Sequence, residues 1–364
     1  MAQAARLRHP EAVVECLDVL SDSPGGFSAV YSSTYLLLVR HLSWVWRLSY
    51  ALLDQDAIYR FVQPVRQRWN FWIARRLVDR LKTTRPDVVL VTHFLPADVC
   101  SAGRAQGWLQ APVVVVVTDL HPHWFWISSH ADAVVAATPE SVALLQRRGV
   151  VPSRIHLAGI PIDPAFGRPV DRTTVLAQLQ LSMDRLTVLV TSGGTTVGNF
   201  NRVVQALVDL EPRWPGRLQL IVVCGQDAMA QARWTQAAAS SRMPMRVFGF
   251  IDRMAELMGV SDLIVTKAGG LTVSEALARE LPLILSHVIP GQERLNAAYV
   301  VRHGAGIIAP TPRQVSAAVV RLLQDPEQRT AMRHAAKQLG GAGAAARIVA
   351  DVMDPLLACT PRRS

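Results

Sequence analysis

Two glycine-rich segments in the second half of the chain have the composition of phosphate-binding loops. Residues 190–199 (VTSGGTTVGN) contain Gly193 and Gly194, and residues 266–276 (TKAGGLTVSEA) contain Gly269 and Gly270. Glycines at a strand–helix turn let backbone N–H groups approach a phosphate, and a helix amino terminus favours its negative charge. The first segment has neither the Walker lysine pattern nor the full dinucleotide fingerprint. Two such loops in one domain predict a site for a nucleotide diphosphate.

The second segment supports two interpretations. We expect a helix to begin near Thr272 with Glu275 in its first turn, which is the spacing of a capping box. In the functional interpretation the same geometry makes an anion-binding helix start, and Glu275 accepts hydrogen bonds from a ribose diol.

A third polar segment, residues 289–296 (IPGQERLN), places Gln292, Glu293 and Asn296 at helical spacing just past a Pro-Gly turn. Amide and carboxylate side chains at such a position suit the several hydroxyls of a sugar. Considered alone, the segment is better explained as an ordinary polar first turn.

The elements that must position these segments alternate between strands and helices, which favours parallel, doubly wound sheets. In the first half we expect a helix near 139–148 and strands over 12–20, 88–92, 113–118, 133–136 and 155–158. After the proline-rich stretch 159–169 the pattern restarts, with strands over 186–191, 218–224, 245–250, 263–266 and 283–285. Helices are expected there over 201–210, near 254–258 and over 272–279.

The predicted fold class is therefore α/β, with two doubly wound Rossmann-like domains. A chain of 364 residues exceeds the usual size of a single core. We expect a first domain over 1–160, a linker over 161–172, a second domain over 173–340 and a C-terminal helix and tail over 341–364. The alanine-rich stretch 340–350 is expected to be a loop that runs into the final helix. Ligands on such sheets lie at the carboxyl ends of the strands, so the cleft between the domains is the expected site.

Composition narrows the class of protein further. Half of the residues are hydrophobic and 18% are charged, which excludes a disordered chain. No run reaches the roughly 18 apolar residues of a spanning helix, and the amino terminus lacks the apolar core of a signal peptide. The four cysteines show no metal spacing, and Cys16 and Cys224 are expected to be core residues. A reduced, cytoplasmic compartment is the best match.

The net charge of +10 is concentrated beside aromatic residues. Between Arg60 and Arg85 there are eight Lys or Arg residues and one acid, Asp79, and seven of the nine tryptophans precede residue 127. Such a helix suits the headgroup zone of an anionic membrane, and an ordinary amphipathic helix is an equally good interpretation. The arginines expected on this helix are Arg66, Arg68, Arg75, Arg76 and Arg80.

Several of these segments closely resemble one family of glycosyltransferases, the monogalactosyldiacylglycerol synthases and processive diacylglycerol glucosyltransferases. In the second half they are 248–254 (FGFIDRM), 261–276 (SDLIVTKAGGLTVSEA) and 289–293 with Asn296. In the first half they are 85–93 (RPDVVLVTH), 118–125 (TDLHPHWF) and 159–163 (GIPID). The resemblance runs from about residue 16 to about residue 310. The same fold family, called GT-B, includes the N-acetylglucosaminyltransferase of peptidoglycan lipid synthesis.

The resemblance implies an acceptor lipid under the first domain and a UDP-sugar on the second. By that analogy Phe250 and Met254 border the uracil, and Glu275 holds the ribose. The pyrophosphate would be surrounded by the loop residues Gly193, Gly194, Gly269, Gly270, Leu271 and Thr272. Gln292, Glu293 and Asn296 would contact the sugar.

An inverting transfer needs a base for the acceptor's hydroxyl proton, and positive charge or dipoles to stabilise the departing UDP. Helix starts supply the second requirement without a metal or other cofactor. The candidates for the base are Asp119, His93 and His121, of which we prefer Asp119. Asp119 could instead be a helix cap, and either histidine a satisfied polar loop residue.

The sequence departs from the family at its start. The family opens with a strand and a Gly-Gly-Gly-His loop, and nothing similar precedes residues 12–20. We therefore expect a fold that lacks this strand and loop. Either the true start lies upstream, which we favour, or the loop has been lost and the first sheet keeps an unpaired edge.

These observations predict an inverting transferase that moves a hexose from a UDP-sugar to a membrane lipid such as diacylglycerol. The expected location is cytoplasmic, on the inner face of the membrane. A polyprenyl-linked or other lipid acceptor, or a catalytically impaired membrane- and nucleotide-binding homologue, are the alternatives. A nucleic-acid-binding protein is not expected, because no recognisable base-stacking or groove-entering motif is present. Glucose and galactose donors are not distinguished.

Overall fold

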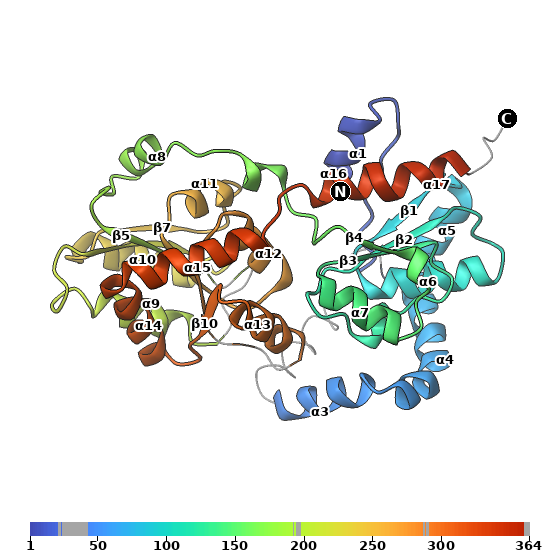
Figure 1. The fold of residues 1–364 in the computed structure, drawn as a ribbon, viewed down its shortest axis with the longest axis horizontal. Helices are drawn as coiled ribbons and strands as arrows, with labels where there is room; N and C mark the ends of the chain where they lie inside the picture. The colour runs from blue at the N-terminus through green and yellow to red at the C-terminus, as the bar shows by residue number, and fades with distance from the viewer. Residues whose placement is uncertain are drawn as a thin grey trace. The chain divides into compact units, whose positions relative to one another are not determined.

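The computed structural model describes residues 1–20, 23, 43–191, 193, 198–286, 288 and 291–359. The chain forms two compact units (Figure 1). The first comprises Met1–Pro161, Pro290–Gln292 and Gly343–Ser364, and the second comprises Ile162–Ile289 and Glu293–Ala342. Each unit contains one parallel sheet with helices packed against it, so the predicted α/β fold class is confirmed.

The first unit is built on a four-stranded sheet in the order β1-β2-β3-β4. Its strands are β1 (Val89–Val91), β2 (Val113–Val116), β3 (Ala133–Ala136) and β4 (Ile155–Leu157), and all of them pair in parallel. Every residue of β2 and β3 is buried, as expected for short β-branched and alanine runs covered on both faces. The helical segments of this unit are α1 (Ala2–Arg8), α3 (Ser43–Leu53), α4 (Asp56–Ile73), α5 (Arg75–Thr84), α6 (Phe94–Ala105), η1 (Trp124–Trp126), α7 (Pro139–Arg147), η2 (Pro152–Arg154), α16 (Ala344–Arg347), η4 (Ile348–Met353) and α17 (Asp354–Cys359).

The alanine-rich stretch near the C-terminus is a loop only over residues 340–343 and is helical from Ala344, so its prediction as a loop up to residue 350 was wrong in its second part. Ala344 and Ala345 are buried in α16, and Ile348 and Val352 of η4 pack on the sheet of the first unit. Alanine has the highest helix propensity, and its small side chain allows close packing. The end of the chain therefore completes the core of the first unit.

The expected strand over residues 12–20 is absent from the described residues. Val13 is exposed, Val14 packs against the buried cluster that α1 forms with η4, and Val19 and Leu20 pack against the core of the first unit without forming a strand. Cys16 in this segment is exposed, which corrects its assignment to the core, whereas Cys224 is buried as predicted. An apolar run becomes a strand only when a neighbouring strand pairs with it.

The basic stretch after residue 60 forms two helices where one was expected. α4 ends at Ile73 and α5 begins at Arg75, with Ala74 between them at φ −92° and ψ 21°. Arg66, one of the predicted surface arginines, is instead largely buried. Arg80 is exposed and pairs with Glu15 at 2.7 Å.

The second unit carries a six-stranded parallel sheet in the order β10-β9-β8-β5-β6-β7. The strands are β5 (Leu186–Thr191), β6 (Leu218–Val223), β7 (Met245–Phe248), β8 (Leu263–Thr266), β9 (Leu283–Leu285) and β10 (Gly306–Ile308). The helices are η3 (Pro164–Gly167), α8 (Arg172–Gln178), α9 (Phe200–Val208), α10 (Ala228–Ser240), α11 (Met254–Gly259), α12 (Gly270–Ala278), α13 (Gln292–Arg302), α14 (Pro312–Gln324) and α15 (Pro326–Leu339).

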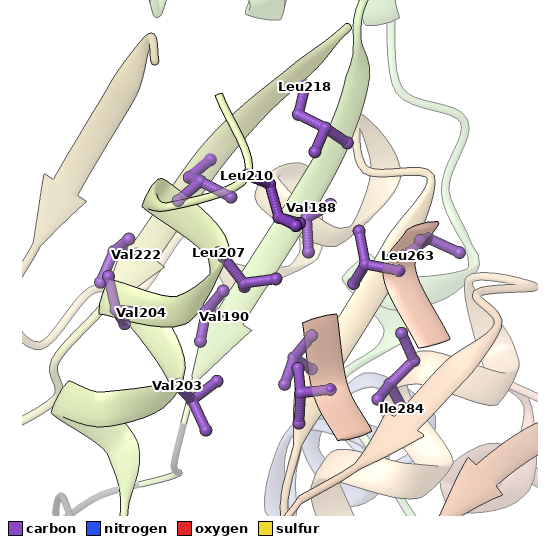
Figure 2. Close-up of a cluster of buried hydrophobic side chains, with 14 of the residues drawn as sticks. Val188, Val190, Val203, Val204, Leu207, Leu210, Leu218, Val222, Leu263 and Ile284 are labelled. Atoms are coloured by element: carbon purple, nitrogen blue, oxygen red, sulfur yellow. The ribbon is translucent and has the colours of Figure 1, made fainter. Parts of the chain in front are cut away.

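Both faces of this sheet are buried, because every residue of β5, β6 and β8 is buried, and one core cluster lies between the sheet and helices that include α9. Figure 2 shows Val203, Val204 and Leu207 of α9 directed toward the side chains of β5 and β6. Residues three and four apart on a helix share a face, so these positions form one apolar stripe on α9. This packing fixes the ends of β5 and β8, where the glycine loops begin.

Candidate functional site

The two glycine loops leave neighbouring strands of the second unit. β5 and β8 pair in parallel, with Val188 opposite Leu263 and Val190 opposite Val265. Their carboxyl ends therefore lie at the same edge of the sheet, the edge at which doubly wound sheets bind ligands. The structure brings Gly193 to this edge together with Gly269 and Gly270. Gly194 lies outside the described residues.

Gly193 adopts a conformation that favours glycine. Its φ is +79°, and a Cβ atom placed there would lie 3.1 Å from Cε of Lys267. Its N–H group donates to Oγ1 of Thr191 at 3.3 Å. A side chain at this position would be strained and would displace Lys267.

α12 begins earlier than the sequence suggested. Gly269 is its N-cap and Gly270 its first residue, so Thr272 lies inside the first turn and Glu275 in the second. The predicted capping box of Thr272 and Glu275 is therefore wrong. Within the described part of the chain no side chain caps this helix, which leaves its first N–H groups available to a ligand.

The Glu275 carboxylate is poised for a polar ligand. It is partly buried, and among the described residues it forms no hydrogen bond or ion pair. Burial, helped by the charge of Asp163, raises the pKa of Glu275 to about 7. A carboxylate that loses water without gaining a partner is destabilised, and hydrogen bonds from a diol would reverse that effect.

The three polar residues of α13 differ in their surroundings. Gln292 is exposed, whereas Glu293 and Asn296 are buried. Nδ2 of Asn296 donates to the carbonyl oxygen of Ala268 at 3.1 Å, and Oε1 of Glu293 lies 4.0 Å from Nζ of Lys267. Asn296 thus holds the second glycine loop in place through its bond to Ala268. Contact of these residues with a sugar stays a prediction.

Two large apolar side chains that follow strands of this sheet are exposed, one after the outer strand β7 and one after β8. Phe250, just after β7, is 71% exposed, and Leu271 in the first turn of α12 is 51% exposed. Met254, the first residue of α11, is partly buried. The contacts of Phe250 and Met254 with a uracil stay a prediction.

In the first unit, the predicted base Asp119 is buried just after β2. Its Oδ2 accepts a hydrogen bond from Nε1 of Trp126 at 2.9 Å. Burial raises the pKa of Asp119, and the Trp126 hydrogen bond partly offsets that rise. A raised pKa makes a carboxylate a stronger base near neutral pH. The sequence argument missed Trp126, whose only signal was an indole seven residues after Asp119.

His93 follows the neighbouring strand β1. Oγ1 of Thr118 donates a hydrogen bond to the carbonyl oxygen of Thr92 at 3.4 Å, which joins the residues that precede Asp119 and His93. Nδ1 of His93 accepts from the N–H of Leu95 at the start of α6, so the neutral ring carries its proton on Nε2. Burial lowers the pKa of His93. The ring is therefore neutral at pH 7 and has no unpaired lone pair for a proton. His121 is partly buried, and its role stays a prediction.

The segment that carries Trp126 is held by a buried polar network. Nδ1 of His123 accepts from the N–H of Phe125, so its Nε2 donates to the carbonyl oxygen of Tyr50 in α3 at 3.1 Å. Oδ1 of Asp54 accepts from the N–H of Trp124 and pairs with Arg148 at 2.9 Å. η1 is thereby fixed to α3 and α7.

α4 packs on the same segment through Arg66. Its guanidinium lies over the rings of Phe125 and Tyr59 at 4.7 and 5.1 Å and pairs with Asp98 of α6 at 3.3 Å. The Arg66 and Asp98 side chains are only 12% and 4% exposed. Asp98 also accepts from Nδ2 of Asn70 at 2.8 Å. Arg66 is therefore a packing residue, which corrects its prediction as a lipid headgroup contact.

The opposite faces of α3 and α4 are apolar and exposed. We call these residues the outer face; they are Trp44, Leu48 and Leu52 of α3 and Phe61, Val65, Trp69 and Trp72 of α4. Their spacing of three and four places each set on one side of its helix. The exposed Arg68 lies in the same turns of α4, and Arg75 and Arg76 are exposed at the start of α5. Among the described helices, none has the length and hydropathy needed to cross a membrane.

The fold and the site define a two-unit glycosyltransferase of the GT-B type, and comparisons with known proteins give its family. Residues 2–162 match the family model for monogalactosyldiacylglycerol (MGDG) synthase, and residues 187–348 match the glycosyltransferase family 28 C-terminal domain. The chain is 30% identical over 281 residues to a processive diacylglycerol beta-glucosyltransferase of Bacillus licheniformis, covering 77% of this chain and 72% of the relative. It is 31% identical over 356 residues to a probable chloroplastic monogalactosyldiacylglycerol synthase 2 of Oryza sativa subsp. japonica, covering 86% and 74%.

Two solved structures share the fold. The MnaA–UDP co-structure of S. aureus has a TM-score of 0.63 at 18% identity and covers 83% of this chain and 84% of that chain. MurG of Acinetobacter baumannii has a TM-score of 0.55 at 19% identity and covers 76% of each chain. The chain thus belongs to the family of MGDG synthases and processive diacylglycerol glucosyltransferases, which confirms the resemblance seen in its sequence.

Proposed function

We propose that this hexosyltransferase moves a hexose from a UDP-sugar to diacylglycerol, with inversion at the anomeric carbon, at an anionic membrane surface. The observation that carries the proposal is the arrangement at the carboxyl ends of β5 and β8 in the second sheet, which we call the donor edge. There an uncapped helix start, the Gly193 turn and the unpartnered Glu275 carboxylate meet the needs of a nucleoside diphosphate. The names of the two relatives supply the acceptor class.

In the proposed reaction an acceptor hydroxyl oxygen forms a bond to the anomeric carbon of the hexose. The bond from that carbon to the β-phosphate oxygen of UDP breaks, and its electron pair leaves with UDP. We assign the hydroxyl proton to Asp119, because one of its oxygens is held by Trp126 and its pKa is raised by burial. His93 is a weaker candidate, because its Nδ1 lone pair is already used by Leu95.

We assign membrane docking to the outer face of α3 and α4. Exposed Trp, Phe and Leu residues beside Arg68, Arg75 and Arg76 match the boundary between acyl chains and anionic headgroups. A diacylglycerol acceptor resides in such a membrane, so docking would bring the first unit to its substrate. The proposed location is the cytoplasmic face of the membrane.

The experiment is a transfer assay with the purified chain and vesicles of phosphatidylglycerol, phosphatidylcholine and diacylglycerol. UDP-glucose and UDP-galactose are supplied separately, and mass spectrometry detects the monohexosyl lipid. We expect product with at least one donor, none from vesicles without diacylglycerol, and a strong loss with Glu275→Ala. Product only with a polyprenyl-linked acceptor would change the acceptor class. UDP binding without any product would favour a catalytically impaired homologue.

A further inference from the structure

Lys267 lies at the donor edge, where it contacts Gly193 and Glu293. It follows β8 directly and precedes the Gly269–Gly270 turn. The chain has only three lysines, Lys82, Lys267 and Lys337, among its 38 basic Lys and Arg residues. A lysine is therefore the exception in this chain, and this one belongs to the second glycine loop and reaches Gly193 of the first.

The Lys267 side chain runs from one loop to the other. Its Cε lies 3.1 Å from the position of a Cβ at Gly193, so the absence of a side chain at residue 193 makes room for the lysine stem. A linear ammonium stem passes through this space, whereas the planar fork of arginine is bulkier. Gly193 and Lys267 thus form one structural feature, although 74 positions separate them in the sequence.

The ammonium group of Lys267 retains its capacity to bind a ligand. Nζ lies 4.0 Å from Oε1 of Glu293, within ion-pair range and beyond the usual length of a hydrogen bond. Among the described residues Lys267 donates no hydrogen bond, and its side chain is 23% exposed. An ammonium group has three N–H donors. Glu293 keeps the charge in place, and the donors remain for another acceptor.

We propose that Lys267 is a catalytic residue that binds the diphosphate of the nucleotide-sugar and stabilises the departing UDP. This inference rests on the proposed function and adds a specific cation to it. As the bond between the anomeric carbon and the β-phosphate oxygen breaks, the electron pair moves onto UDP and its negative charge grows. The Lys267 ammonium and the start of α12 face that charge together, and Lys267 keeps its proton throughout. A fixed positive charge at this point stabilises the transition state more than the ground state.

The test compares three ligands that share the uridine group and differ in phosphate content. Calorimetric titration with uridine, UMP and UDP is carried out on the wild type, on Lys267→Met and on the control Lys337→Met. Methionine keeps an unbranched stem and removes the charge. Lys337 is an exposed lysine that pairs with Glu280 at 2.8 Å, so its replacement matches the change in net charge.

We expect Lys267→Met to weaken UDP binding about 10- to 100-fold, as for loss of a hydrogen bond to a charged group, while uridine affinity stays unchanged. The preference for UDP over uridine should persist in Lys337→Met and should be partly restored in Lys267→Arg. Raising the NaCl concentration should reduce UDP affinity in the wild type more than in Lys267→Met. Unchanged uridine binding also shows that the variant is folded at this site.

Other outcomes overturn the inference in distinguishable ways. A wild type that binds uridine and UDP equally, or a Lys267→Met variant with the wild-type UDP preference, would exclude a diphosphate contact for Lys267 and leave the donor site intact. Equal weakening of uridine and UDP would assign Lys267 a purely structural role. A folded wild type that binds neither ligand would instead contradict the proposed function itself.

Discussion

The two regions that carry candidate chemistry differ in how much of their polar capacity is already used. In the first unit, His123, Asp54 and Arg148 have partners within the protein, and Arg66 pairs through Nη2 while its Nε and Nη1 are buried without a hydrogen bond. These residues hold the segment beside Asp119. At the donor edge of the second unit, the start of α12 is uncapped by any described side chain, and the Glu275 carboxylate has no partner there. The first region is organised before any ligand binds. We propose that the second is completed by the nucleotide-sugar.

This difference predicts that substitutions in the first region lower stability, whereas substitutions at the donor edge lower affinity. The largest effect is expected for Arg66→Gln, which leaves Asp98 buried without its cation. Removal of one partner of a buried ion pair costs about 3 kcal/mol or more. Denaturant unfolding measures the change. Arg68→Gln, at an exposed position of the same helix, should change stability by less than about 0.5 kcal/mol. Equal effects of the two variants would remove the contrast between the regions.

At the donor edge we expect Glu275→Ala to weaken uridine binding about 10- to 100-fold, because a charged acceptor of the ribose hydroxyls is lost. Its unfolding midpoint should not fall, since the variant also removes a carboxylate that is poorly solvated in the free protein. Calorimetry and thermal unfolding on the same sample give both values. A stability loss as large as that of Arg66→Gln would place Glu275 with the packing residues.

Because the pKa of Glu275 is raised, both the stability of the protein and its affinity for uridine should depend on pH, with opposite signs. Because its folded pKa is about 7, above the unfolded value, the folded state binds the extra proton, and stability falls as pH rises from about 4.5 to 7. Ligand binding has the opposite sign, because only the ionised carboxylate accepts hydrogen bonds from both hydroxyls. Uridine affinity should rise by at most about tenfold per pH unit up to pH 7 and then level off. Uridine has no phosphate that titrates in this range, and Glu275→Gln should abolish the dependence.

The outer face of α3 and α4 should affect membrane binding and neither stability nor donor affinity. We expect Trp69→Ser with Trp72→Ser to reduce binding to phosphatidylglycerol vesicles about tenfold or more, through loss of two partly inserted indoles. Co-sedimentation with vesicles measures the change. Met229→Ser, at an exposed apolar position of α10, is the matched control and should bind as the wild type does. Equal binding by both would locate the membrane contact elsewhere.

The smallest effect is expected at Gly193. Gly193→Ala should cost about 1 kcal/mol in stability because of its positive φ, and Gly107→Ala, with φ +77° and open space around it, should cost the same. Only Gly193→Ala should also weaken UDP binding, because its methyl group displaces Lys267. If both variants bind UDP like the wild type, the contact between Gly193 and Lys267 has no role in the donor site.

Much of the fold could be predicted from the sequence because its strands are short, apolar and bounded by turn residues. The strands 186–191, 263–266 and 283–285 agree with the structure at every residue. The prediction of a strand over residues 12–20 was wrong because composition alone does not show whether a partner strand exists. The prediction of a loop over 340–350 was wrong from residue 344 onward, because β2 and β3, against which Ile348 and Val352 pack, are more than 200 positions away in the sequence.

The site was less accessible to sequence reasoning, because its details depend on helix phase and on contacts between distant residues. The Thr272–Glu275 spacing suggested a cap, and the helix in fact begins two residues earlier, at Gly270. Arg66 and Arg68 are two positions apart, and only the structure shows which of them faces Asp98. The bond from Asn296 to Ala268 joins segments 28 positions apart that no local pattern connects.

The central claim is that Asp119 of the first unit acts as the base while the second unit binds the donor. The most direct test measures the rate of monohexosyl lipid formation and the UDP affinity together, for the wild type and for Asp119→Asn. Asparagine keeps the size of the side chain and an oxygen for the Trp126 hydrogen bond but removes the basic group. We predict a rate that is about 10²- to 10⁴-fold lower, with unchanged UDP affinity. A variant that forms product at the wild-type rate would contradict the account.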